Sequence, residues 1–182
     1  MKKLFVLFTL ILSFSVVSAQ DYVVEDGYMT MRKVVENTNL SADECYQQMK
    51  VFFGKFFKNV NEVCKVDTPS KQVYKFVCDV AQINKGLGVY HTFHADYELE
   101  IAIKDNRMRV TLVAYRVDCL DMHPYEGYNP ANSYPILGSH DIWGTGVTKK
   151  QAQTIFDGLL KNMQSLMTQI DGALQSSTED EW

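Results

Sequence analysis

The sequence predicts an α+β protein: a two-layer sandwich in which a curved antiparallel sheet of five strands carries two helices on one face. Several stretches place apolar residues on one side of an extended chain, and two longer stretches repeat them at helical spacing. The elements follow the order strand, helix, four strands, helix. Because the strands and both helices have an apolar side, one sheet face is expected to pack against the helices and the other to face water.

The first strand is expected over residues 28–36, in a region rich in β-branched and aromatic side chains. The first helix is expected over 42–58, because Ser41 and Glu44 form a capping box just before it. Its apolar residues follow helical spacing: Cys45, Met49, Phe52, Phe53, Phe56 and Phe57. A stripe of this kind is typical of a helix face that packs in a core.

Four strands are expected next, separated by turn residues. Their ranges are 60–68, 72–83, 92–104 and 107–118. The third range alternates most clearly between apolar and polar residues, which is typical of a half-buried antiparallel strand. The last range is largely apolar on both faces, which predicts an interior strand.

Residues 119–147 show no periodicity and hold three of the four prolines. A connection of this length without its own secondary structure is usually functional or disordered. The second helix is expected over 148–174, since Thr148 and Gln151 form another capping box and an apolar stripe follows. The acidic residues 176–182 are expected to form a flexible tail.

Residues 1–19 have the features of a signal peptide. Lys2 and Lys3 precede an apolar run, and Val17-Ser18-Ala19 is a suitable cleavage site, so cleavage is predicted after Ala19. The run is shorter than the roughly 20 residues of a membrane-spanning helix. We therefore expect a single domain over 20–175, located in the periplasm or secreted, with no membrane span once the signal peptide is removed.

The charge balance argues against nucleic acid as a partner. Two of the 18 basic residues, Lys2 and Lys3, lie in the signal peptide, which leaves 16 against 22 acidic residues and a formal charge of −6. Nucleic-acid binding depends on neutralising phosphates with clustered cations. The mature chain lacks that overall cationic character.

All four cysteines follow the signal peptide, and an even number in an oxidising compartment permits two disulfides. A turn centred near residue 71 would set Cys64 opposite Cys78 on the apolar side, which permits a cross-strand disulfide. The alternative is that the cysteines are buried free thiols that pack as small apolar side chains.

Asp96, Glu98 and Glu100 share one strand face, and three carboxylates at this spacing could bind calcium or supply a general acid and base. The simpler explanation is a strand face exposed to water. The sequence has no nucleophile elbow, no recognised metal-ligand spacing and no glycine-rich nucleotide motif. We therefore predict no catalytic residue, metal or cofactor.

The aromatic residues of the long loop are the preferred binding-site candidates: Tyr125, Tyr128, Tyr134 and Trp143. Tyrosine and tryptophan are enriched in interfaces, so they suit contact with a protein or a glycan. The alternative is that the loop folds back and these rings cover the edge of the sheet or the helix ends.

Three features together resemble a known family: the leader that begins with two lysines and ends in Ala-Gln, the capped helix after Asn39-Leu40, and the stretch from Tyr97 to Val110. The family is domain of unknown function 4468, secreted proteins mostly of gut and oral Bacteroidetes with a TATA-binding-protein-like fold. The resemblance covers about residues 28–120 as sequence, is sharpest at the Lys104-Asp105-Asn106-Arg107 turn, and continues through the last helix as topology. It implies this fold but no activity or site residue, and the fold alone does not imply DNA binding.

The sequence therefore favours an exported, non-catalytic binding module that contacts an envelope or extracellular protein, or less favourably a glycan. Two other hypotheses stay open. One is a hydrolase that uses the acidic strand face, and the other is a structural subunit that forms oligomers. The sequence does not specify an oligomeric state.

Overall fold

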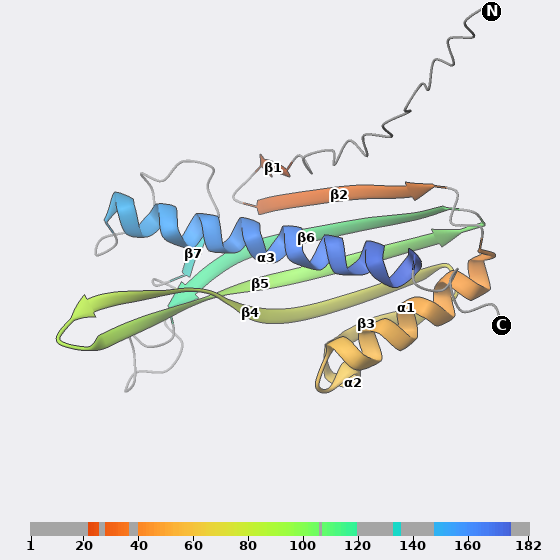
Figure 1. The fold of residues 1–182 in the computed structure, drawn as a ribbon, viewed down its shortest axis with the longest axis horizontal. Helices are drawn as coiled ribbons and strands as arrows, with labels where there is room; N and C mark the ends of the chain where they lie inside the picture. The colour runs from red at the N-terminus through yellow and green to blue at the C-terminus, as the bar shows by residue number, and fades with distance from the viewer. Residues whose placement is uncertain are drawn as a thin grey trace, which may run out of the picture.

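The computed structural model of the chain describes residues 22–25, 28–36, 40–105, 107–119, 133–135 and 148–175 (Figure 1). The predicted signal peptide, most of the 119–147 loop and the 176–182 tail lie outside the described residues. The two long helices, α1 (Ala42–Phe56) and α3 (Lys149–Gln175), lie against the same face of one antiparallel sheet. This confirms the predicted α+β architecture. We call the opposite sheet face the open face.

Within the described residues the sheet has seven strands, whereas five were predicted. In space they follow the order β1-β2-β6-β5-β4-β3, and β7 pairs with β6. The five predicted strands correspond to β2 through β6. The two additional strands, β1 and β7, have only four and three residues, too few for alternation to reveal them. The bounds are β1 (Tyr22–Glu25), β2 (Tyr28–Glu36), β3 (Cys64–Thr68), β4 (Lys71–Gly86), β5 (Val89–Lys104), β6 (Arg107–Cys119) and β7 (Ser133–Pro135).

Strands β4 and β5 form a longer hairpin than the sequence predicted. The predicted ranges, 72–83 and 92–104, leave eight residues between the strands, but Gly86 pairs with Val89 and only two residues make the turn. Leu87 and Gly88 both have positive φ, of 50° and 79°. A two-residue turn with positive φ at both positions matches the twist of antiparallel strands, so the hairpin continues to its tip.

The predicted pairing of Cys64 with Cys78 is wrong. The β3–β4 turn is centred between Pro69 and Ser70, and a bulge follows, so Cys64 lies opposite Tyr74. Cys78 lies next to Ala95 of β5 instead. Residues 60–63, predicted as strand, form the short helix α2 (Val60–Val63) and therefore offer Cys78 no strand partner. None of the four cysteines, all of which the structure describes, forms a disulfide.

The core lies between the sheet and the helices. On β5 the predicted apolar face is buried throughout, with each residue at most 3% exposed: Phe93, Ala95, Tyr97, Leu99, Ile101 and Ile103. Strand β6 lies between β2 and β5, as its two apolar faces predicted. The apolar stripe of α3, which runs from Ala152 to Leu174, is buried against the sheet. No helix among the described residues is long and apolar enough to span a membrane.

Both predicted capping boxes are present. The Ser41 hydroxyl accepts from the Glu44 amide at 3.3 Å, and a Glu44 oxygen accepts from the Ser41 amide at 2.8 Å. At α3 the same reciprocal bonds join Thr148 and Gln151, at 3.3 and 3.0 Å. Each pair satisfies two backbone donors that a helix start leaves without partners.

Helix α3 approaches the backbone of β4 closely where a bulge interrupts the β4–β5 pairing, between Asp79 and Ala81. The Asn162 amide donates to the Asp79 carbonyl at 2.7 Å. One turn earlier stands Gly158, where a Cβ would lie 1.9 Å from the Val80 carbonyl oxygen. The Asp79 and Val80 carbonyls at the bulge thus lie close to α3, and the absence of a side chain at Gly158 permits this approach.

Candidate functional site

The predicted acidic residues lie on the open face, and each carboxylate has a cationic partner from a neighbouring strand. Glu98 and Glu100 accept from Lys75 and Lys71 of β4, at 2.8 and 2.6 Å. On the β6 side, Arg116 Nε lies 2.7 Å from Asp96 Oδ2, and Arg109 Nη2 lies 3.5 Å from Glu100 Oε1. The open face is therefore a set of cross-strand ion pairs. The predicted acidic residues thus share a face of β5, and cations from β4 and β6, which the sequence did not place beside them, balance their charge.

These ion pairs give Glu100 an electrostatic environment unlike that of a general acid. The hydrogen bond from Lys71 lowers the pKa of the Glu100 carboxyl; burial opposes this shift, and the charges of Lys71 and Arg109 add to it. A carboxylic acid that donates a proton near neutral pH needs a raised pKa. The shift at Glu100 has the opposite direction, which favours a structural role on the sheet surface.

Replacing Glu100 with Gln is expected to lower the stability at pH 7 by up to about 1 kcal/mol, the upper range for partly exposed ion pairs. Because folding lowers the pKa of Glu100, its ionised form stabilises the protein above the unfolded-state pKa of about 4.3. This contribution is lost as the pH falls through the lower pKa of the folded state. Urea unfolding at pH 7 and at pH 3 measures it: the wild type and Glu100→Gln should differ at pH 7 and converge at pH 3. An equal difference at both values would assign the effect to packing.

A basic hollow lies at the end of the open face, beside the β5–β6 turn. It has a volume of about 300 Å³ and is lined by Val34, Ala102, Lys104, Arg107, Met108 and Arg109. Lys104 and Arg107 face each other across the two strands. Neither forms an ion pair with any residue that the structure describes, whereas Arg109 shares Glu100 with Lys71. This end of the open face therefore has a surplus of positive charge.

Sequence reasoning missed the basic hollow, although its signal was present. Lys104 and Arg107 flank the turn that carries the family resemblance, and Arg109 follows two residues later on the same strand face. The turn also holds α1 in place, because Asp105 Oδ1 accepts from the Ala42 amide at the helix start, at 3.2 Å. The same turn thus positions three cations and anchors the helix on the other side of the sheet.

The aromatic loop is largely outside the described residues, which include neither Tyr125, Tyr128 nor Trp143. Tyr134 lies in β7, where its backbone pairs with Val117 of β6, and its side chain is not described. The loop thus leaves the sheet at Cys119 and rejoins it along the last residues of the same strand. The points where the loop joins the sheet therefore lie at the C-terminal end of β6, and the basic hollow lies at the N-terminal end of the same strand.

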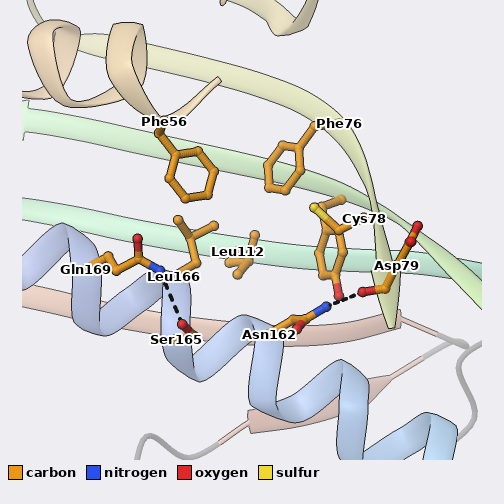
Figure 2. Close-up of a pocket in the computed structure, with 10 residues that line it drawn as sticks. Phe56, Phe76, Cys78, Asp79, Leu112, Asn162, Ser165, Leu166 and Gln169 are labelled. Atoms are coloured by element: carbon orange, nitrogen blue, oxygen red, sulfur yellow. Dashed lines mark hydrogen bonds between the residues drawn. The ribbon is translucent and has the colours of Figure 1, made fainter. Parts of the chain in front are cut away.

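A second hollow, the inner pocket, lies on the helix side of the sheet (Figure 2). Its volume is about 290 Å³, and ten residues line it: Phe56, Phe76, Cys78, Asp79, Tyr97, Leu112, Asn162, Ser165, Leu166 and Gln169. They come from the end of α1, from the inner faces of β4, β5 and β6, and from one side of α3. From the sequence, all the apolar residues of this group are expected in the core. The pocket exists because α1 ends at Phe56 and leaves a space beside α3 that no side chain fills, which only the packed structure shows.

The described residues contain no group of three or more histidine, cysteine, aspartate or glutamate side chains that could hold a metal ion. Cys78 lines the inner pocket as a half-buried thiol, and burial raises its pKa. A thiol with a raised pKa stays protonated, which disfavours metal binding and nucleophilic attack. Its role in the pocket is that of a small, weakly polar side chain.

Comparison with known proteins finds similarity at the level of structure. No family model and no curated protein matches the chain. A solved structure of a TBP-like protein from Parabacteroides distasonis superposes with a TM-score of 0.59 at 12% identity, covering 84% of this chain and 96% of the other. A DUF4468 family protein from Bacteroides ovatus gives a TM-score of 0.54 at 11% identity, covering 84% and 90%. The chain therefore has the TBP-like fold that its sequence resemblance implied, and its structural neighbours include a DUF4468 protein.

Proposed function

We propose that the protein is an exported, non-catalytic binding module whose open face contacts an acidic patch on a protein of the cell envelope or the extracellular space. The observation that carries this proposal is the basic hollow. Lys104 and Arg107 extend from it without an ionic partner in the described chain, on a sheet face that neither α1 nor α3 covers (Figure 1). Complementary charge of this kind raises association rates and selects partners.

The rest of the open face supports contact with a protein. Its ion pairs hold charged side chains in fixed positions, and apolar side chains lie exposed between them. Tyr28, Val34 and Val77 are 44%, 49% and 59% exposed. A mixture of aromatic, aliphatic and arginine side chains is typical of protein interfaces. A neutral glycan is the less favoured partner because it would leave the cations of the hollow without countercharge.

Reversing the charge of the basic hollow should abolish this contact. In the full chain, expressed with its own leader, we expect Lys104→Glu with Arg107→Glu to reduce partner binding at least tenfold. Both side chains are exposed, so the fold should tolerate the change. The matched control is Lys150→Glu with Lys161→Glu, which makes the same change in charge on the exposed side of α3. Crosslinking in the native cell envelope identifies the partner, and titration of the purified partner at two salt concentrations measures affinity.

The expected result is that the wild type and the α3 control bind equally, that the hollow variant does not bind, and that affinity falls as salt rises. Equal binding by all three proteins would contradict the proposed surface. Cell fractionation of the same cultures tests export: the mature chain should begin at Gln20 and lie outside the cytoplasm. Retention of residues 1–19 in a cytoplasmic product would contradict the proposed location.

A further inference from the structure

We propose that the inner pocket binds a small, neutral, largely apolar molecule that carries one hydrogen-bond acceptor, held by the Tyr97 hydroxyl. This inference is independent of the proposed protein contact, since none of the residues that form the basic hollow lines the inner pocket. Three properties of the pocket support it: its size, one buried hydroxyl and the charge of its lining.

The pocket has the size and the walls of a small-molecule site. Its volume of about 290 Å³ is at the lower end of the range of about 300–1,000 Å³ for ligand pockets, and a cavity of about 150 Å³ already holds benzene. Phe56 and Phe76 project from α1 and β4 on one side of it, and Leu166 of α3 lies on the other (Figure 2). Phe56 is 36% exposed, which places an aromatic ring within reach of an entering ligand. The shape therefore suits a molecule of one ring.

Tyr97 supplies a polar group inside this apolar space. The residue is only 3% exposed, and its hydroxyl makes no hydrogen bond of ordinary geometry with the described residues. The Asn162 amide lies beside this hydroxyl: one of its N–H groups donates to the Asp79 carbonyl, and the other is available to the Tyr97 oxygen, so it is the phenol's own proton that lacks an acceptor among the described residues. Buried hydroxyls nearly always have a partner, because a hydroxyl removed from water without one is unfavourable. A ligand acceptor would complete this site.

The Tyr97 phenol is suited to act as the donor. Burial raises its pKa; the nearby Cys78 adds to the shift and the contact with Asn162 opposes it. The hydroxyl therefore keeps its proton at neutral pH. Its ring is held by stacking against Phe76, at 5.3 Å between centroids and 18° between planes. A fixed donor in an apolar site discriminates strongly between ligands that accept its hydrogen bond and ligands that do not.

The charge of the lining residues disfavours an anionic ligand. None of the ten lining residues is a lysine, an arginine or a histidine. The carboxylate of Asp79 points away from the pocket in Figure 2 and lies 2.7 Å from His94. A carboxylate ligand would have to lose its hydration without a countercharge, which is strongly unfavourable. The expected ligand is therefore an aromatic ketone, an ester or an ether of comparable size.

Three probes of nearly equal size test separately whether the ligand must be neutral and whether it must carry a hydrogen-bond acceptor. Acetophenone is neutral with an acceptor, isopropylbenzene is neutral without one, and benzoate is anionic. Titrations of the mature chain are followed by NMR at the methyl groups of Leu112 and Leu166. We expect acetophenone to shift both methyl groups and benzoate to bind at least tenfold more weakly. Tyr97→Phe should weaken acetophenone about fivefold to tenfold and leave isopropylbenzene unchanged, as for the loss of one hydrogen bond.

A second pair of variants tests the location. Ser165 is an exposed residue of α3 at the pocket, so Ser165→Trp should block it and remove binding of both neutral probes. Thr168→Trp, at an exposed position of α3 outside the lining, should leave binding intact. The absence of shifts at both methyl groups with either neutral probe would overturn the proposed site. Equal affinity of the wild type and Tyr97→Phe for acetophenone would overturn the role of the hydroxyl.

Discussion

Replacing Phe53 with Ala is expected to destabilise the protein by about 3–5 kcal/mol, the range for removing a fully buried phenylalanine. The Phe53 side chain is completely buried on the inner face of α1. Its ring contacts four other aromatic rings, with centroid distances from 4.4 to 6.3 Å: Phe52, Phe56, Phe57 and Tyr74. The contact with Tyr74 joins α1 to β4, so the substitution removes packing between the two layers as well as within the helix.

Urea unfolding of Phe53→Ala and of the matched variant Phe56→Ala measures this effect. Phe56 belongs to the same aromatic group but is 36% exposed, so its truncation should cost well under half as much. Domains of this kind have a total stability of about 5–15 kcal/mol, so Phe53→Ala should leave a protein close to unfolding. Similar losses for the two variants would contradict a core centred on Phe53.

Replacing Gly158 with Ala is expected to destabilise the protein by about 2 kcal/mol. In an unhindered helix this substitution stabilises by up to about 1 kcal/mol, because alanine is the better helix former. Here the new Cβ would lie 1.9 Å from the Val80 carbonyl oxygen, a backbone atom held by its own strand. Helix α3 must then move away from β4, and the cost of overpacking, about 3 kcal/mol at its upper end, exceeds the gain.

Gly172→Ala is the control for Gly158→Ala, on the same helix and with the same chemical change. A Cβ at Gly172 meets no atom within 4 Å, so only the helix-propensity gain remains. Thermal unfolding should show a lowered midpoint for Gly158→Ala and an unchanged or slightly raised midpoint for Gly172→Ala. A raised midpoint for both would mean that α3 does not approach the β4 bulge closely.

Several local features were predictable because they depend on neighbouring residues. Strand β2 begins and ends as the sequence predicted, at Tyr28 and Glu36. The alternation of β5 identified its buried side, since a period of two assigns every side chain to a face. The capping boxes at Ser41 and Thr148 were predictable for the same reason, because the groups that bond lie three residues apart.

The register between strands was less predictable than these local features. Moving the centre of the β3–β4 turn from residue 71 to between 69 and 70, followed by a bulge, separates Cys64 from Cys78. A one-residue change in a turn alters every pairing beyond it. For the same reason the sequence did not identify the cationic partners of Asp96, Glu98 and Glu100, which lie from 9 to 29 residues away along the chain. A row of carboxylates in sequence thus became a set of ion pairs in space.

By itself, the sequence determined the α+β class, the order of the main elements, the apolar sides of the helices and strands, and the resemblance to the domain of unknown function 4468 family with its TBP-like fold. Each of these follows from local spacing or from direct similarity. The tertiary structure decided where charge and space remain after packing: the surplus cations of the basic hollow and the inner pocket around Tyr97. Both depend on side chains from elements far apart in the chain, whose relative positions are set by strand register and by the point at which α1 ends beside α3.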